Sequence, residues 1–129
     1  MKSIINFLNE ALINKNSKIT KKIKDDPNTW SKGDILTGTS YYSMIIPYFF
    51  KILKRTDKSF TLIELSEKVV KGHYNGTYWV VPNEDKFEQD LKKGKPINVR
   101  YNKYGRIVVK RNVTLKLWDG EPQEGCDLD

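Results

Sequence analysis

Two apolar runs joined by a short polar link constrain the fold of this chain most strongly. They span Tyr48–Leu53 and Phe60–Leu65, and the link contains Asp57, a residue type that is common in turns. The spacing predicts a β-hairpin, because each run is the length of a strand and the second alternates with period two. That alternation assigns two side chains to each face of the second strand: Phe60 and Leu62 to one, Thr61 and Ile63 to the other.

The first thirty residues have a different character. Residues 3–14 suit a short amphipathic helix with Ser3 as its cap, because their apolar side chains recur at three- and four-residue spacing. A lysine-rich run at 15–24 follows and either extends this helix or forms a flexible arm. Pro27 ends any helix before Asp26.

Beyond the hairpin, several short stretches have the composition of strands. They are residues 33–36, 66–72 (an extended piece or a bend), 78–81, 97–101, 106–111 and 113–118. Asn75-Gly76 is a strong hairpin-turn signal. Residues 37–43 are predicted as a loop, and Pro47 argues against a central strand at 44–47 because proline donates no ladder hydrogen bond.

Two further local signals lie in the second half of the chain. Residues 83–93 predict a helix, since Asn83 can cap it, acidic residues occupy its first turn and lysines its last. Segments 97–101 and 106–111 flank a turn in which Gly105 can adopt the left-handed conformation. We therefore expect these two segments to form a second hairpin.

These elements predict an α+β domain. We expect a small antiparallel β-barrel or a strongly curled sheet of about six strands, with an N-terminal helix and one short inserted helix. The expected organisation is an N-terminal helix and basic arm at 1–29, a β-barrel-like domain at 30–118 and an acidic tail at 119–129.

Charge is divided unequally between body and tail. The net charge is +7, but residues 119–129 hold five acidic side chains and no basic one, which leaves 23 basic and 11 acidic side chains, or +12, on residues 1–118. Such a body attracts polyanions or an acidic protein surface. The tail either lies against the body and competes with such a ligand, or is a solvated end.

Cysteine content and hydropathy bear on the compartment. The single cysteine, Cys126, excludes an internal disulfide and is typical of a reducing compartment. No stretch approaches the length of a membrane span, and the apolar start of the chain lacks a signal-peptide cleavage site. We expect a cytoplasmic protein that makes no membrane contact.

A resemblance follows from residues near both ends of the β body. Gly33-Asp34-Ile35 precedes an aromatic-rich loop and FFKILKRTDKSFTLIEL at 49–65, while Lys95-Pro96-Ile97 precedes a basic strand and LWDGEP at 117–122. This pattern resembles a family of small proteins carried by bacteriophages and other mobile genetic elements. The resemblance covers residues 33–65 and 95–122 and implies a phage or plasmid setting, with no biochemical activity to transfer.

The chain departs from that family pattern at two places. Ser40-Tyr41-Tyr42 stands where the family has a tryptophan-glycine-tyrosine loop, and Met44-Ile45-Ile46 stands where polar residues are usual. If that loop is the binding surface of the family, this chain binds a more apolar partner.

Catalytic chemistry has little support in the residues. The only histidine, His73, has no serine or cysteine nucleophile near it in sequence. One histidine and one cysteine are too few for a typical metal site, and the TGTS at 37–40 lacks the lysine and the helix of a phosphate-binding loop. We expect no enzymatic activity, no cofactor and no metal.

Two surfaces are candidates for binding. The apolar loop before Pro47 is either a core plug or a docking patch for a protein; its residues are Tyr41, Tyr42, Met44, Ile45 and Ile46. The second expected hairpin alternates cations with aromatic rings, as surfaces for single-stranded nucleic acid do; its residues are Arg100, Tyr101, Lys103, Tyr104, Arg106, Lys110 and Arg111.

Two functions follow from these surfaces. The first is a non-enzymatic accessory protein of a phage or mobile element that binds a host protein or ribonucleoprotein and inhibits a nucleic-acid-handling defence system, in the manner of an anti-CRISPR protein. The second is a nucleic-acid-binding module that uses the basic, aromatic hairpin. The apolar loop and the mobile-element resemblance favour the first.

Overall fold

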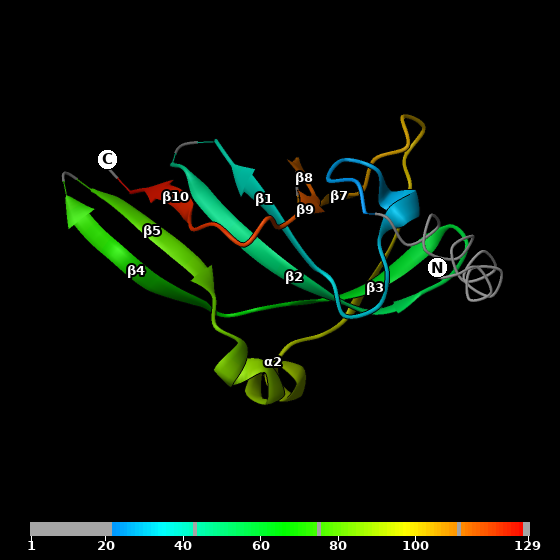
Figure 1. Ribbon diagram of the computed structural model, residues 1–129, viewed down its shortest axis with the longest axis horizontal. Helices are drawn as coiled ribbons and strands as arrows, with labels where there is room; N and C mark the ends of the chain where they lie inside the picture. Colours follow the sequence, from blue (N-terminus) through cyan, green and yellow to red (C-terminus); the bar gives the residue numbers. More distant parts are fainter. Residues whose placement is uncertain (1–21, 43, 75, 111, 128–129) are drawn as a thin grey trace, which may run out of the picture.

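The computed structural model describes residues 22–42, 44–74, 76–110 and 112–127 (Figure 1). Of these residues 49% lie in strands and 13% in helical turns, so the fold is mainly β. The strands are β1 (Ile35–Ser40), β2 (Ile46–Arg55), β3 (Ser59–Glu64), β4 (Glu67–Tyr74), β5 (Thr77–Pro82), β6 (Ile97–Arg100), β7 (Val108–Val109), β8 (Val113–Thr114), β9 (Lys116–Leu117) and β10 (Gln123–Cys126). The helical elements are η1 (Pro27–Thr29), η2 (Glu84–Lys86) and α2 (Phe87–Lys93).

The predicted β2–β3 hairpin is confirmed and forms the centre of the largest sheet. That sheet has five antiparallel strands in the order β6-β3-β2-β1-β9. β2 is the longest strand, and it pairs with β3 on one side and with the whole of β1 on the other. The hairpin therefore holds together segments from both halves of the chain.

A β-bulge between Ile52 and Lys54 interrupts the pairing of β2 with β3. Before the bulge Ile52 pairs with Leu62, and after it Lys54 pairs with Thr61 and Arg55 with Phe60. Paired residues in an antiparallel sheet share a face, so the extra residue moves Lys54 and Arg55 onto the faces opposite to those that strict alternation would give.

Both faces of the five-stranded sheet carry a hydrophobic core. On the Trp30 face, the buried side chains are Trp30, Leu36, Phe50, Ile52, Phe60, Leu62, Ile107, Val109, Val113 and Leu115. On the opposite Phe49 face, they are Phe49, Ile63, Leu65 and Val80, with Phe87 of α2 and Trp118 packed against them. The predicted division of β3 is confirmed for its apolar residues, since Phe60 and Leu62 lie in the first core and Ile63 in the second. Burial of one such side chain contributes about 1.5–3 kcal/mol, so two-sided burial makes the hairpin the most stabilised element.

A second sheet has the strand order β10-β5-β4, and β4 and β5 meet at the predicted turn, where Gly76 has a φ of 79°. β10 comes from the acidic tail, part of which is therefore a paired strand. Gly125 of β10 faces Tyr78 of β5, and a Cβ at Gly125 would lie 2.4 Å from that ring, so only glycine fits under it. A backbone bridge between Ile45 and Cys126 joins the two sheets, with hydrogen bonds of 3.0 and 2.8 Å.

The expected barrel is wrong. In the described part of the chain the strands form three open sheets of five, three and two strands, and none closes or curls strongly. Ten strands replace the expected six, and the fold is mainly β instead of α+β. The large sheet ends in the short strands β6 and β9, which do not pair with each other, and its cores lie on its two outer faces.

The two expected helices have different outcomes. The inserted helix is confirmed as η2 and α2, although the Asn83 side chain makes no capping hydrogen bond. The N-terminal helix expected at 3–14 lies outside the described residues.

The second expected hairpin is also wrong. β6 pairs with β3, while β7 pairs with β8 in a sheet of their own. The intervening turn does form, with Gly105 at a φ of 75° and Asn102 donating its N–H to the Arg106 carbonyl at 2.8 Å. The flanking segments diverge because residues 107–115 pack Ile107 and Val109 onto the Trp30 face.

Two local predictions near β1 need correction. Residues 37–40, predicted as loop, belong to β1, and the buried Pro47 lies inside β2. Pro47 is tolerated because β3 pairs with β2 only from Phe50 onward, which leaves this section of β2 with β1 as its ladder neighbour. Within the described ranges, no helix is both long and apolar enough to span a bilayer.

Candidate functional site

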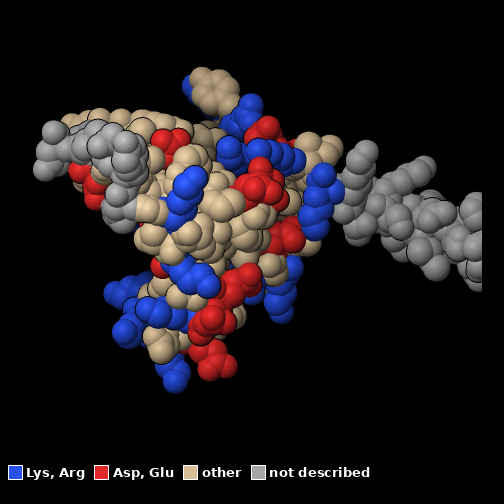
Figure 2. All heavy atoms as spheres, turned by 60° about the vertical axis from the view of Figure 1, so that its left-hand side comes forward, with Lys and Arg blue, Asp and Glu red and all other residues tan. Residues whose placement is uncertain are grey.

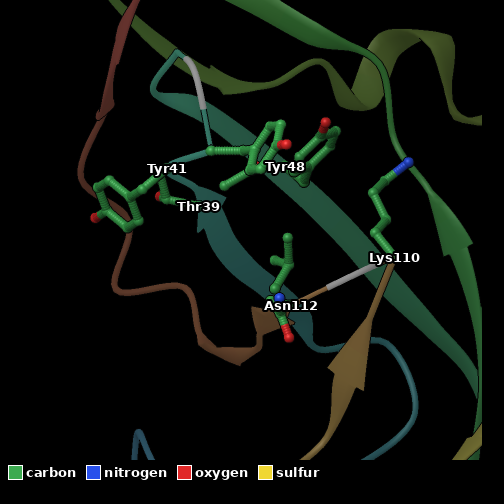
Figure 3. Close-up of a pocket in the computed structure, with 8 residues that line it drawn as sticks. Thr39, Tyr41, Tyr48, Lys110 and Asn112 are labelled. Atoms are coloured by element: carbon green, nitrogen blue, oxygen red, sulfur yellow. The ribbon is translucent and has the colours of Figure 1, made fainter.

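A pocket of about 650 Å³ lies where β1 ends, beside β2 and the turn that joins β7 to β8. Figure 3 shows Tyr41 and Lys110 on opposite sides of it. Its lining combines aromatic rings with hydroxyl and amide groups and one cation: Thr39, Ser40, Tyr41, Tyr42, Tyr48, Lys110, Asn112 and Val113. A hollow of about 330 Å³ adjoins it and shares Thr39, Tyr41 and Asn112.

The β1–β2 connection presents two tyrosines at this pocket. β1 ends at Ser40 and the Ile45 backbone is held by Cys126, so Tyr41 and Tyr42 lie in the short connection between two fixed points. Tyr41 is 73% exposed and Tyr42 is 89% exposed. Large aromatic rings left this open are typical of binding surfaces, because tyrosine combines a large apolar area with a hydrogen-bonding hydroxyl.

The floor and wall of the pocket are held rigidly. Tyr48 lies opposite Gly38 in the β1–β2 ladder, and the buried Thr37 hydroxyl donates to the Tyr48 carbonyl at 2.9 Å. A Cβ at Gly38 would lie 2.6 Å from Val113 Cγ1 and 2.7 Å from the Thr114 carbonyl oxygen. Glycine therefore lets residues 113–115 cross β1 in close contact, and this crossing positions Asn112 and Val113.

Lys110 is the cation of the pocket and has an unusual backbone. Its φ is 53°, which is the left-handed region that non-glycine residues rarely occupy. Its ammonium group lies 4.5 Å from the centre of the Tyr48 ring and 3.1 Å from Oε1 of Glu64. The carboxylate offsets the charge of the ammonium, so the pocket is closer to neutral than its lysine suggests.

Glu64, the carboxylate beside Lys110, also acts on a second acidic side chain, Glu67. Burial raises the pKa of Glu67 above the usual 4.5, and repulsion from the Glu64 carboxylate raises it further. The ionised form of Glu67 is therefore disfavoured in the folded protein.

The predicted docking loop divides into exposed and anchored parts. Tyr41 and Tyr42 line the pocket, whereas Met44, Ile45 and Ile46 are half-buried, with Ile45 paired to Cys126 and Ile46 starting β2. Sequence reasoning did not identify Thr39, Tyr48, Asn112 and Val113 as pocket residues. The sequence places Tyr48 in a strand, and Asn112 reaches the site only through the crossing at Gly38.

The predicted nucleic-acid residues do not form one surface. Arg100, Lys103, Tyr104 and Arg106 are exposed on β6 and the turn after it, and Lys103 lies 5.1 Å from the centre of the Tyr104 ring. Lys110 lies in the pocket and Arg111 is outside the described residues. Tyr101 is half-buried and packs against Phe60 at the edge of the core, with ring centres 6.0 Å apart, so part of its surface is taken up by that contact.

The Tyr101 hydroxyl takes part in an interior network around Arg55, a residue that sequence reasoning did not single out. The Arg55 guanidinium donates to the carbonyls of Pro27 (2.9 Å) and Trp30 and to the Tyr101 hydroxyl (3.1 Å). It also lies 4.8 Å from the centre of the Phe60 ring. The network fastens residues 27–30 to the end of the sheet.

Several other groups have structural surroundings. The Asp90 carboxylate accepts from the Ser66 backbone N–H at 2.8 Å and from its hydroxyl at 2.6 Å, which ties α2 to the β3–β4 connection. In the described part of the chain no three His, Cys, Asp or Glu side chains gather as metal ligands would. The His73 side chain lies outside that part.

Charge is mixed over the surface that Figure 2 shows, where basic and acidic side chains alternate with uncharged areas. In the described part of the chain, basic and acidic side chains also pair directly, as in Lys22–Asp34 (2.9 Å) and Lys51–Glu84 (3.8 Å). On this face the net charge of +7 therefore does not translate into one continuous basic surface.

No protein-family model matches the sequence, and comparison with curated proteins and with solved structures gives no significant match. The resemblance to mobile-element proteins therefore stays a prediction.

Proposed function

We propose that this chain is a non-enzymatic accessory protein of a phage or mobile element, and that it binds a host protein through the Tyr41–Tyr42 pocket. In this proposal the bound protein belongs to a defence system that handles nucleic acid, and binding inhibits it. The place of action is the cytoplasm, where such systems meet incoming nucleic acid.

The exposure of Tyr41 and Tyr42 over a pocket of about 650 Å³ is the observation that carries the proposal. Tyrosines are enriched among the residues that dominate binding energy at protein interfaces. The adjoining hollow lengthens the site past Tyr41, which suits an extended segment of a partner better than a compact small molecule.

The electrostatics of the pocket favour a protein partner over nucleic acid. Glu64 already pairs with Lys110, and Glu67 adds a further carboxyl group near Glu64. A phosphate group would have to displace Glu64 from Lys110 to gain a full ion pair. An apolar or aromatic side chain with a neighbouring backbone amide gains ring contacts and hydrogen bonds to Asn112 and Thr39 without that cost.

The inhibitory role rests on the sequence resemblance to phage and mobile-element proteins. Inhibition by occupying a surface of the host protein requires no catalytic group. The pocket has the aromatic lining of such a surface.

Affinity capture from nuclease-treated bacterial lysate tests the proposal with a matched pair of variants. Tyr41→Ala/Tyr42→Ala removes both rings from the pocket. Tyr104→Ala removes a ring that is equally exposed, at 73%, from a different turn. We expect one stoichiometric partner to be retained by the wild type and by Tyr104→Ala and to be lost by the double variant.

A second measurement tests inhibition. Adding the wild-type protein to the purified partner should lower its cleavage or binding of nucleic acid, and the double variant should not. Retention of the partner by Tyr41→Ala/Tyr42→Ala, or capture that disappears after nuclease treatment, would contradict the proposal.

A further inference from the structure

One part of the Phe49 face of the five-stranded sheet carries polar and cationic side chains in place of a core. Lys54 pairs with Thr61, and Thr61 pairs with Asn98, so these three residues form a row across β2, β3 and β6. Arg100 lies two residues farther along β6, on the same face as Asn98, and extends the row to four residues.

The β-bulge puts Lys54 in this row. Leu53 already belongs to the Phe49 face, and strict alternation would send Lys54 to the Trp30 face. The register shift between Ile52 and Lys54 pairs Lys54 with Thr61 and so keeps both Leu53 and Lys54 on the Phe49 face. Bulges commonly redirect a side chain at a binding surface.

The C-terminal end of α2 meets this face at Ile63. A Cβ at Gly94 would lie 3.0 Å from Ile63 Cδ1, which marks where the end of the helix meets the sheet. Figure 1 shows α2 beneath the end of β3 that leads into β4, away from the β2–β3 turn. Beyond Ile63, Lys54, Asn98 and Arg100 are all exposed.

One hydrogen bond within the row fixes the orientation of the Asn98 amide. The Thr61 hydroxyl donates to Oδ1 of Asn98 at 2.7 Å, so the Asn98 NH₂ group is directed away from Thr61. None of the ion pairs within the described part of the chain involves Lys54 or Arg100. The surface therefore offers two uncompensated cations with amide donors between them.

We propose that this row, Lys54, Thr61, Asn98 and Arg100, binds the phosphate backbone of a nucleic acid. Phosphate oxygens are contacted in protein–nucleic acid complexes mainly by Lys, Arg, Ser, Thr and Asn, and the row consists of these residue types. A protein partner is less favoured, because the row has no apolar side chain to act as the buried anchor of an interface.

This surface is independent of the tyrosine pocket and contains only Arg100 from the set predicted from sequence. It has no aromatic ring for a base to stack on. Binding is therefore expected to depend on phosphate and salt and to be insensitive to base sequence.

Fluorescence anisotropy with a labelled short DNA duplex, measured between roughly 50 and 200 mM salt, tests the proposal on the full chain. We expect the affinity of the wild type to fall steeply with salt. Lys54→Glu/Arg100→Glu should weaken binding by at least about tenfold and lower the salt slope by about two, since each phosphate contact contributes about one. Lys68→Glu/Lys71→Glu on β4 makes the same charge change at exposed positions of the other sheet and should keep most of the slope.

Thermal unfolding of both variants checks that they are folded, which is expected since all four positions are exposed. Equal loss of affinity in the two double variants would overturn the proposal, because only net charge would then matter. Absence of binding at low salt would overturn it too. Polyglutamate that displaces the labelled duplex as well as an unlabelled duplex does would contradict the proposal, because the row would then bind acidic protein equally well.

Discussion

Two tyrosine–cation pairs at different places in the fold have opposite surroundings. Tyr101 and Arg55 lie beside the core, where carbonyl oxygens and the Phe60 ring satisfy the guanidinium. Tyr48 and Lys110 lie at the pocket, where one carboxylate and one ring contact the ammonium beside two open tyrosines. The same residue types therefore serve stability at one place and remain available for binding at the other.

The backbone conformation also differs between the stabilising pair, Tyr101–Arg55, and the pocket pair, Tyr48–Lys110. Arg55 lies within β2, and its hydrogen bonds fasten residues 27–30. Lys110 holds a left-handed φ in a two-strand turn, a conformation that costs a non-glycine residue about 1 kcal/mol. Strain that persists beside a pocket suggests that the lysine side chain is needed there.

Loss of the Arg55 network should have the largest effect. Arg55→Ala removes hydrogen bonds to the carbonyls of Pro27 and Trp30 and to the Tyr101 hydroxyl. The Pro27 carbonyl keeps the Trp30 N–H and the Tyr101 hydroxyl keeps Asn28 as a partner, so we expect a loss of about 2 kcal/mol in the free energy of unfolding. Denaturant titration measures it. Lys54→Ala, one residue earlier and exposed, is the control and should change stability by less than about 0.5 kcal/mol. Similar values for the two variants would remove the distinction between the regions.

At the pocket, the expected effect is smaller and depends on the replacement. Lys110→Gly loses a partly exposed ion pair and a ring contact but relieves the backbone, so its stability should stay within about 1 kcal/mol of the wild type. Lys110→Ala loses the same contacts and keeps the strain, so it should be less stable than the glycine variant by about 1 kcal/mol. An alanine variant as stable as the glycine variant in denaturant would refute the strain at this turn.

The smallest effect should come from Glu67 and should depend on pH. Its pKa is raised in the folded protein, so between 4.5 and that raised value the folded state binds more protons than the unfolded state. Stability therefore decreases as pH rises through this window, and the ionised carboxylate is destabilising above it. Glu67→Gln should be slightly more stable than the wild type at neutral pH, and the difference should vanish below 4.5. Glu88→Gln on α2 controls for the loss of one charge, and a gain independent of pH would contradict the assignment.

Local patterns predicted the central part of the fold. The alternation in 60–65 identified the β2–β3 hairpin and its two faces, and the charges of 83–93 identified α2. The Asn75-Gly76 signal identified the turn at which β4 and β5 meet, although 66–72 was left open between a strand and a bend. Each of these signals lies within a few residues of the structure that it specifies. The barrel and the hairpin at 97–111 were wrong because closure and strand partners depend on contacts between distant segments.

The same distinction applies to the candidate site. Tyr41 and Tyr42 could be singled out from sequence, since aromatic residues before a proline in a polar stretch suggest a surface. The approach of Lys110 to Tyr48 depends on a tight crossing at Gly38. The spacing of apolar residues in the sequence does not predict such a crossing. Acidic residues are poor strand formers, so the composition of the tail did not predict strand β10.

The bridge between Ile45 and Cys126 connects the pocket to that tail strand. Proteolytic cleavage in the segment between β9 and β10 would leave β10, one of the two supports of the loop that carries Tyr41 and Tyr42, held only by its pairing with β5 and Ile45. Conversely, a partner that immobilises this loop would protect β10 from proteases. Occupancy of the pocket could therefore be followed by the rate at which a protease cleaves near β10, about eighty residues later in the sequence.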